Sequence, residues 1–277
     1  MTLRDDLVLK FGSDRVLAHQ SLFAHRHPDP TPPFHDELIG LWHSPAPRVL
    51  TLAFRSGGKS TLAEEALVLI AAQRLVRNIL IIGSNSDRAN DRLRAIKHEF
   101  DTNDDLIDLY GNLHGSIWNE GRIVLANGVC IQAFGRGQAL RGVKHLDMRP
   151  VFCFCDDLEE EDHIRTADAR QETLRWFMRE LIPVLDKNGR IRVNATPLDR
   201  EALPMVLSRQ QGWIKRFIQS STSIRRAFAA RPGRHVFPSG GSTKSERNFS
   251  RWGFRLSFRR NICACLRIQP EKCSLHR

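Results

Sequence analysis

The segment AFRSGGKST, residues 53–61, contains the residue types that hold a nucleotide phosphate. In a phosphate-binding loop, backbone N–H groups surround the phosphates, a lysine pairs with the β and γ phosphates, and a hydroxyl reaches Mg²⁺. Two glycines allow the tight backbone, while Lys59 and Ser60 supply the charge and the hydroxyl. The usual pattern has glycine where Ala53 stands, so an ordinary strand-to-helix turn is the alternative. The residues expected to bind ATP are Ser56, Gly57, Gly58, Lys59, Ser60 and Thr61.

A pair of carboxylates follows a second apolar run in VFCFCDDLEEED, residues 151–162. Five apolar residues place Asp156 and Asp157 at the carboxyl end of a strand, the usual ligand-binding edge of an open α/β sheet. One carboxylate there can hold Mg²⁺ through water while its neighbour polarises the attacking water. We assign Asp156 to the metal together with Ser60, and Asp157 to the base, with Glu159 as a reserve base. Alternatively, Asp157–Asp162 only cap and solvate the next helix, and for Glu159–Asp162 this interpretation is preferred.

Other polar positions carry weaker signals. The sequence NATP, residues 194–197, ends an expected strand with Thr196, whose hydroxyl could sense the γ-phosphate, although Thr-Pro also ends strands for steric reasons. Arg141 lies in a glycine-flanked loop and could reach a phosphate or DNA, or simply be solvated. Cys153 and Cys155 alternate on one strand face, which favours core packing over metal binding. The histidines near the prolines have no ligand spacing, and no role is assigned to them.

The elements that must position these residues alternate between strand and helix. This order predicts an α/β fold in which helices cover both faces of a mostly parallel sheet. With the phosphate loop, it indicates a P-loop NTPase of the RecA-like (ASCE) type, a three-layer sandwich. Strands are expected at residues 47–54, 77–86, 151–155 and 189–196, and helices at 59–76, 86–103 and 166–185.

Two local signals refine these elements. Residues 121–135 contain two alternating runs separated by Asn127 and Gly128, a pair that suits the positive φ angles of a type I′ turn, and we expect a hairpin there. The helix that follows the second strand should begin with Ser86 or Asp87 near its N-cap.

Composition limits the possible classes of protein. A chain of 277 residues with 41% hydrophobic content can bury a full core, which argues against disorder throughout. No apolar run has the length of about 18 residues that a membrane span needs, and the start of the chain lacks a signal peptide's apolar stretch. Six sparse cysteines indicate reduced thiols. We therefore expect a soluble intracellular protein without a membrane partner.

The net charge of +11 is unevenly distributed along the chain. Residues 215–277 contain 15 lysines and arginines but only two acids, so the body of the chain is nearly neutral. Near residue 220 the sequence also loses any sustained helical or strand periodicity. We expect three parts: an N-terminal helical segment with a proline-rich connector (1–30), a P-loop ATPase domain (31–219), and a basic irregular tail (220–277).

Taken in order, these motifs resemble the N-terminal ATPase domain of the large subunit of tailed-phage terminases, the motors that pump DNA into procapsids. The resemblance covers roughly residues 30–215 and is most specific over 135–157. The matching stretches are AFRSGGKST, IIGSNSDRANDRL, Trp118 with the following IVLANGVCIQAFGRGQALRGVKHLDMRP, then VFCFCDDLEEED and WFMRELIPVLDKNGRIRVNATPL.

The resemblance implies roles for individual residues. Lys59 and Ser60 match the Walker A lysine and hydroxyl, and Asp156 matches the Walker B aspartate. Asp157 matches the adjacent catalytic carboxylate, which is commonly glutamate in the wider family, so its shorter side chain has less reach. The remaining matches are Arg55, an arginine inside the loop that could stabilise charge on the γ-phosphoryl group and contact ATP, and Thr196, in the motif that couples hydrolysis to DNA movement. Arg141 is the further candidate for a phosphate contact.

The resemblance also implies cofactors and partners. The cofactors would be ATP and Mg²⁺, and the partners would be double-stranded DNA, a portal protein, a terminase small subunit and further copies of the chain in a ring. The setting would be the cytoplasm of a bacterial host. There are two alternatives: an inactive remnant that at most binds nucleic acid, and another P-loop motor such as a helicase. The resemblance over residues 135–157 argues against the helicase.

The end of the chain departs from the family. A complete terminase large subunit continues into an RNase H-like nuclease domain with a cluster of metal-binding acids, and the two acids of residues 215–277 cannot build a two-metal nuclease. We expect the tail to be a truncated or out-of-frame ending without nuclease activity. The competing interpretation is a basic DNA-binding tail in which Trp252, Phe254 and Phe258 stack on bases.

Overall fold

The computed structural model describes residues 2–28 and 31–219. The tail expected at 220–277 lies outside the described residues, so its assignment remains a prediction. The contacts separate the first residues, up to Lys10, from a compact unit that spans Phe11–Gln219, and most of helix α1 (Leu3–Ser13) belongs to the former. Among the described helices, none combines the length and the apolar character of a membrane span.

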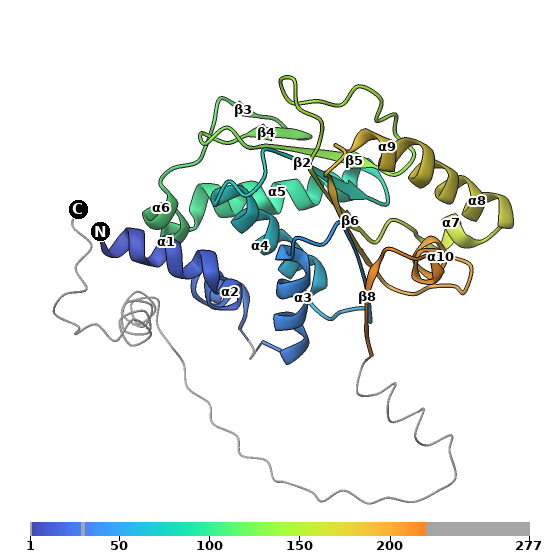
Figure 1. The fold of residues 1–277 in the computed structure, drawn as a ribbon, viewed down its shortest axis with the longest axis horizontal. Helices are drawn as coiled ribbons and strands as arrows, with labels where there is room; N and C mark the ends of the chain where they lie inside the picture. The colour runs from blue at the N-terminus through green and yellow to red at the C-terminus, as the bar shows by residue number, and fades with distance from the viewer. Residues whose placement is uncertain (1, 29–30, 220–277) are drawn as a thin grey trace, which may run out of the picture. The chain divides into compact units, whose positions relative to one another are not determined.

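A sheet of eight strands forms the middle layer of the unit Phe11–Gln219 within the described residues (Figure 1). The strand order is β3-β4-β5-β2-β6-β7-β1-β8, and every neighbouring pair from β5 to β8 is parallel. Strands β3 and β4 add an antiparallel end. The strands are β1 (Arg48–Ala53), β2 (Asn78–Gly83), β3 (Ile117–Trp118), β4 (Arg122–Val124), β5 (Cys130–Gly135), β6 (Phe152–Asp156), β7 (Arg190–Ala195) and β8 (Ile214–Ile218).

Helices cover both faces of this sheet, with α3, α4 and α5 on one side and α8, α9 and α10 on the other (Figure 1). The predicted α/β sandwich with a mostly parallel sheet is therefore confirmed. The remaining helical elements are α2 (Arg15–Leu22), a 3₁₀ turn (Ala24–Arg26), α3 (Pro33–His43), α4 (Lys59–Ala72), α5 (Ser86–Thr102), α6 (Asp104–Tyr110), α7 (Glu161–Ile164), α8 (Ala167–Trp176), a π-helical turn (Phe177–Leu181), α9 (Ile182–Val184) and α10 (Leu203–Arg209).

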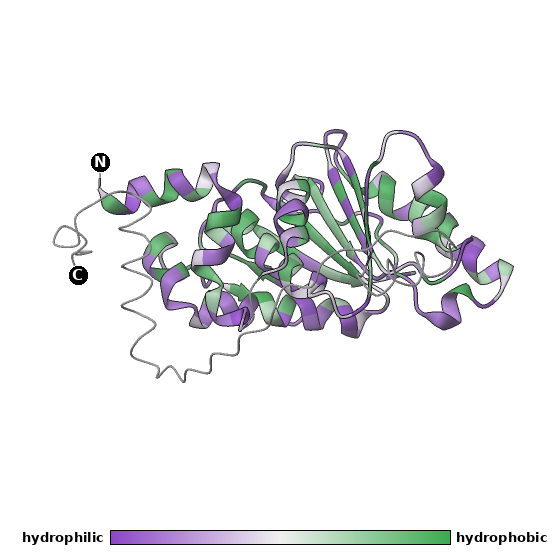
Figure 2. Ribbon diagram, turned by 90° about the horizontal axis from the view of Figure 1, so that it is seen from below, coloured by the Kyte–Doolittle hydropathy of each residue, from purple (hydrophilic) through white to green (hydrophobic). Residues whose placement is uncertain are grey.

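Side-chain alternation explains how the central strands bury both faces. Leu50 and Leu52 of β1 enter the core under α8–α10 together with Phe177, whereas Thr51 between them is fully buried on the opposite side. Strand β2 is buried along its whole length, as expected for a parallel strand with helices on both faces. In Figure 2 the strands are largely green, with purple polar residues concentrated on the helices and loops.

The cysteine pair of β6 belongs to the same core. Cys153 and Cys155 are fully buried, with their sulfur atoms 3.7 Å apart, so the expectation of core packing is confirmed. Burial raises the pKa of the Cys155 thiol well above its ordinary value, and the neighbouring Cys153 acts in the same direction.

One expected detail of local structure is confirmed and another is wrong. Helix α5 begins at Ser86, as expected, and its N-cap is Asn85, whose side chain accepts a hydrogen bond from the Arg88 backbone N–H at 2.9 Å. The hairpin of β4 and β5 is present, but its turn is not type I′. Only Gly128 has a positive φ, 83°, and its N–H donates to the Leu125 carbonyl, so Asn127 keeps an ordinary backbone conformation.

The N-terminal segment contacts the sheet domain through polar residues. Arg26 forms an ion pair with a glutamate of α4, and the ring nitrogens of His25 and His27 contact glutamates of α5 and α4. The proline-rich stretch ends where α3 begins at Pro33. Residues from Phe11 onward therefore pack as part of the same compact unit.

Candidate functional site

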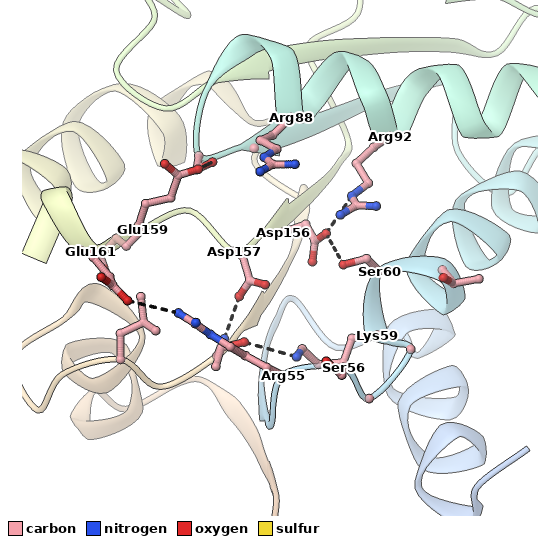
Figure 3. A pocket seen from close by; sticks show the side chains of 18 residues that line it. Arg55, Ser56, Lys59, Ser60, Arg88, Arg92, Asp156, Asp157, Glu159 and Glu161 are labelled. Carbon is pink, nitrogen blue, oxygen red and sulfur yellow. Dashed lines mark hydrogen bonds and ion pairs between the residues drawn. The ribbon is translucent and has the colours of Figure 1, made fainter.

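A cleft of about 510 Å³ opens at the carboxyl edge of the sheet, where the neighbouring strands β6, β7 and β1 end (Figure 3). All residues of the loop 55–61 line it, together with Asp156, Asp157 and Thr196. The topology thus brings together residues that are up to about 140 positions apart in the sequence, as expected for the ligand-binding edge of an open α/β sheet.

The loop between β1 and α4 depends on backbone conformations that few residues adopt. Gly58 has a φ of 70° directly before the first residue of α4, and Ser56 has a φ of 61°. A side chain at Gly58 would also place its Cβ 3.1 Å from the His35 ring. His35, from α3, donates from Nε2 to the Gly57 carbonyl at 2.8 Å and supports the loop. Both conformation and packing therefore favour glycine at position 58.

Lys59 lies buried at the base of the cleft, with its ammonium group surrounded by oxygen atoms. Its Nζ donates to the Phe54 carbonyl at 2.7 Å and to the Thr196 hydroxyl at 3.3 Å. Burial lowers the pKa of Lys59, and the nearby carboxylates of Asp157 and Asp156 oppose that shift. A phosphate oxygen can replace these neutral acceptors at the same ammonium group.

Asp156 is held by donors from three elements. Asn194 of β7 donates from Nδ2 to Oδ1 at 2.6 Å, and Ser60 of α4 donates from Oγ to Oδ2 at 2.8 Å. Arg92 of α5 places Nε 3.0 Å from the same Oδ2. Asn194 is itself fixed from the next strand, since the Thr51 hydroxyl donates to its Oδ1 at 3.2 Å. The carboxylate therefore has a single defined position in the wall of the cleft.

The pair of Ser60 and Asp156 suits magnesium. Mg²⁺ prefers oxygen ligands and is usually held by one or two protein oxygens together with water and substrate phosphates. The hydroxyl and carboxylate oxygens lie 2.8 Å apart and face the cleft that Lys59 also lines. Within the described residues, no group of three or more His, Cys, Asp and Glu side chains could hold a metal by itself. A metal here would thus take part of its ligands from a bound phosphate.

Asp157 turns the chain away from β6 into the cleft. Its φ is 41°, a left-handed conformation that aspartate tolerates better than most residues. Its backbone N–H donates to the Asn194 carbonyl at 2.9 Å, and its Oδ1 accepts the Thr196 backbone N–H at 2.7 Å. Burial raises the pKa of Asp157, repulsion from Asp156 adds to the rise, and the Thr196 N–H and Lys59 counteract it. Such a carboxylate is a suitable general base.

Glu159 is the second carboxylate with a perturbed environment. Its Oε2 accepts the Leu203 backbone N–H at 2.8 Å, whereas its buried Oε1 has no hydrogen-bond partner among the described residues. Burial raises the pKa of Glu159 to about 7, only partly offset by the Leu203 N–H. Glu159 also lines the cleft, so its position is compatible with the role of reserve base.

The two arginines singled out in the sequence lie in different places. Arg55 stands at the rim of the cleft with 66% of its side chain exposed, and its Nη2 is 3.9 Å from Glu161 Oε1 (Figure 3). Arg141 does not line the cleft. Its side chain is 87% exposed and pairs with Glu180 at 3.1 Å, next to a smaller pocket of about 250 Å³.

Three residues that hold the site were not singled out from the sequence: His35, Arg92 and Asn194. Asn194 had a detectable signal, because it stands two residues before Thr196 on the expected strand and so shares its face. Arg88 and Arg92 are one helical turn apart and both line the cleft, a spacing that was visible in the sequence. His35 had no such signal.

The chain is similar to known proteins at the level of solved structures. No protein-family model matches the chain, and no curated protein matches it. The crystal structure of the HK97 bacteriophage large terminase is similar with a TM-score of 0.45 and 12% identity, over 69% of this chain and 40% of that one. The ATPase domain of the Thermus phage P74-26 large terminase gives a TM-score of 0.47 and 15% identity, over 74% and 89%.

A third similar structure is S. cerevisiae Dbp5 with ADP, at a TM-score of 0.44 and 9% identity, over 73% of this chain and 51% of that one. The chain therefore spans less than half of the HK97 protein and about half of the Dbp5 chain.

Proposed function

We propose that the chain hydrolyses ATP with Mg²⁺ in the cleft at the carboxyl edge of the sheet. One observation supports this most strongly: Lys59, the Ser60–Asp156 pair and Asp157 converge on a single cleft from the glycine-rich loop with the start of α4 and from the end of β6. Its volume, about 510 Å³, lies in the range of small-molecule sites. A lysine, a hydroxyl–carboxylate pair and a second carboxylate are the groups that phosphoryl transfer requires.

The loop and its lysine would bind the phosphates. Lys59 exchanges its contacts with the Phe54 carbonyl and Thr196 for phosphate oxygens, while loop N–H groups near Gly58 complete the cradle. Ser60 and Asp156 would hold the metal, which, when bound, neutralises charge on the phosphate oxygens. Asn194 keeps Asp156 in place for this role.

Asp157 would accept the proton of the attacking water. Its raised pKa makes it a better proton acceptor than an ordinary aspartate, and the Thr196 N–H fixes its orientation. Glu159 is the alternative base, because its unpaired oxygen and its pKa of about 7 also suit proton transfer. Arg55 at the rim would stabilise charge that develops on the γ-phosphoryl group.

Phosphate release from ATP by the full chain tests this proposal and separates the two candidate bases. Lys59→Ala should abolish turnover, and Asp157→Asn should reduce it by about 100-fold or more, the contribution typical of a general base. Glu159→Gln should change it only slightly, and the reverse result would move the base to Glu159. Arg94→Gln is the matched control, since Arg94 is exposed and does not line the cleft. Equal rates for the parent and Lys59→Ala would reject the site.

We further propose that hydrolysis drives double-stranded DNA into a procapsid, as in the terminase motors that the motifs resemble. The partners would then be DNA, a portal protein, a terminase small subunit and other copies of the chain in a ring. A basic surface that could contact DNA phosphates supports the proposal that the chain binds DNA. The pocket of about 250 Å³ outside the cleft is lined by four basic side chains, those of Arg141, Lys144, Arg149 and Arg179.

The salt dependence of DNA binding tests this part independently of ATP turnover. Lys144→Gln with Arg179→Gln removes two exposed charges from the surface and should flatten the slope of log affinity against log salt concentration by about 2. ATP turnover without DNA should not change. An unchanged slope would exclude this surface from DNA binding.

A further inference from the structure

Arg92 connects the metal-side carboxylate of the cleft to a buried glutamate behind it. Its Nε lies 3.0 Å from Asp156 Oδ2, and its Nη1 donates to Glu64 Oε1 at 2.8 Å. Both acids are almost completely buried, whereas the Arg92 side chain is 33% exposed toward the cleft. Figure 3 shows Arg92 and Ser60 approaching Asp156 from two sides. One guanidinium thus serves two buried carboxylates at once.

The N-terminal segment anchors the other end of this arrangement. Arg26 pairs with Glu64 through Nη2, and its Nε lies 3.7 Å from both Glu65 Oε1 and Glu99 Oε1. Positive and negative side chains therefore alternate from Arg26 through Glu64 and Arg92 to Asp156. Since a buried ion that loses its partner is costly, each member holds the next one in place.

We propose that Arg92 is a positioning residue that competes with magnesium for Asp156, and that Glu64 sets the strength of this competition. The inference rests on the proposed Mg²⁺-dependent ATPase. The Arg92 guanidinium and the Ser60 hydroxyl contact the same oxygen, Asp156 Oδ2, which is the oxygen that the Ser60–Asp156 pair would present to the metal.

Electrostatics makes the competition strong. A divalent ion beside Asp156 would stand within a few ångströms of the guanidinium, and like charges at that distance repel substantially in the partly buried cleft. Arg92 must therefore loosen its contact with Asp156 when the metal binds. Glu64 gives it an alternative partner on the same guanidinium, so Arg92 can move without leaving a buried charge unpaired. The contact between Arg92 and Glu64 therefore sets the magnesium concentration that nucleotide binding needs.

Magnesium titrations of the full chain with a fluorescent, non-hydrolysable ATP analogue test the proposal without measuring turnover. Arg92→Gln should lower the magnesium concentration at half-maximal binding by about tenfold or more. Arg94→Gln removes the same charge from the outer side of α5 and should leave this midpoint unchanged. Arg88→Gln removes a charge from the cleft wall, at a residue outside the ion pairs of Asp156, and should shift the midpoint less than Arg92→Gln.

Glu64→Gln provides a test of opposite sign. Without Glu64, Arg92 has only Asp156 as an acidic partner among its ion pairs, so the magnesium midpoint should rise. When Arg92 is already replaced by glutamine, Glu64→Gln should shift the magnesium midpoint much less, because Glu64 acts through Arg92. Arg92→Lys keeps the positive charge, so its magnesium midpoint should lie closer to that of the parent than the midpoint of Arg92→Gln does. This variant distinguishes an effect of the lost charge from an effect of misfolding.

The outcomes separate failure of this proposal from failure of the proposed function. If the parent does not bind the analogue with magnesium, the ATPase proposal fails. If the parent binds it and Arg92→Gln leaves the midpoint unchanged, or Arg88→Gln shifts it equally, the competition proposal is wrong. Arg92→Gln could instead bind the analogue more weakly at every magnesium concentration while keeping the parent's midpoint. This result would assign Arg92 a merely structural role and would also overturn the competition proposal.

Discussion

Asn194 offers the sharpest test of how the sheet fixes the cleft. It is fully buried on β7, directly between β6 and β1, and in register with Asp156 on one side and Thr51 on the other. Its Nδ2 donates to Asp156 Oδ1 at 2.6 Å, while its Oδ1 accepts the Thr51 hydroxyl at 3.2 Å. We expect Asn194→Ala to destabilise the fold and displace the carboxylate.

The expected loss in the free energy of unfolding follows from these contacts of Asn194. A hydrogen bond to a charged group contributes about 1.5–3 kcal/mol, and Asp156 is too buried for water to replace the lost donor fully. The small cavity left by the truncation adds roughly 1 kcal/mol. Thr51 contributes little, since its hydroxyl also lies 3.3 Å from the Val193 carbonyl and keeps that acceptor. Asn194→Ala should therefore lower the free energy of unfolding by about 3 kcal/mol.

Urea unfolding of the full chain, followed by circular dichroism, measures this loss. Thr51→Val is the matched control, because it removes only neutral hydrogen bonds, those of the hydroxyl to Asn194 Oδ1 and to the Val193 carbonyl, and should cost about 1 kcal/mol or less. A loss of less than about 1 kcal/mol for Asn194→Ala would refute the reasoning, as would a loss no larger than that of Thr51→Val. Either result would mean that Asp156 does not depend on β7.

Three further predictions concern the surroundings of the site. Glu159→Gln should be more stable than the parent at pH 8 but not at pH 4.5. Burial raises the carboxyl pKa in the folded state to about 7, so the parent loses stability as the pH rises from the ordinary pKa of 4.5 to about 7, and urea unfolding at pH 4.5 and pH 8 measures this loss. Burial lowers the pKa of His43 well below its ordinary value, so the free energy of unfolding should fall as the pH drops below 6.5, with a slope of up to about 1.4 kcal/mol per pH unit from this one histidine. His43→Gln should flatten this decline in a pH series of unfolding curves, and an unchanged slope would assign it to other groups. His35→Ala removes the donor to the Gly57 carbonyl and should weaken ATP-analogue binding about fivefold in a fluorescence titration, whereas unchanged affinity would show that the loop is rigid without His35.

The elements that could be predicted from the sequence are those with local signals. The apolar run of β1, the glycine-rich loop and the helix α4 follow one another without interruption, and the run before Asp156 ends at the same sheet edge. Periodicity within each element was enough to place Lys59 and Asp157 in one cleft, because the carboxyl ends of parallel strands meet. The fold and the meeting of these residues in one cleft therefore followed from pattern and topology together.

The supporting contacts were not predictable because they join distant parts of the chain. Arg92 meets Asp156 across 64 positions, and His35 reaches Gly57 across 22, so each contact depends on the order of the strands and on helix placement. Arg26 lies in a stretch whose prolines favour a connector, yet it pairs with Glu64 in the domain. Charge partners of this kind leave no periodic trace in a single sequence.

A crystal structure of the chain with Mg²⁺ and a non-hydrolysable ATP analogue tests the central claim most directly. We predict that the terminal phosphates contact Lys59 and the loop around Gly58, that the metal lies at Ser60 and Asp156, and that Asp157 or Glu159 faces the γ-phosphate. Density for the analogue elsewhere, or a metal bound away from Ser60 and Asp156, would contradict this claim.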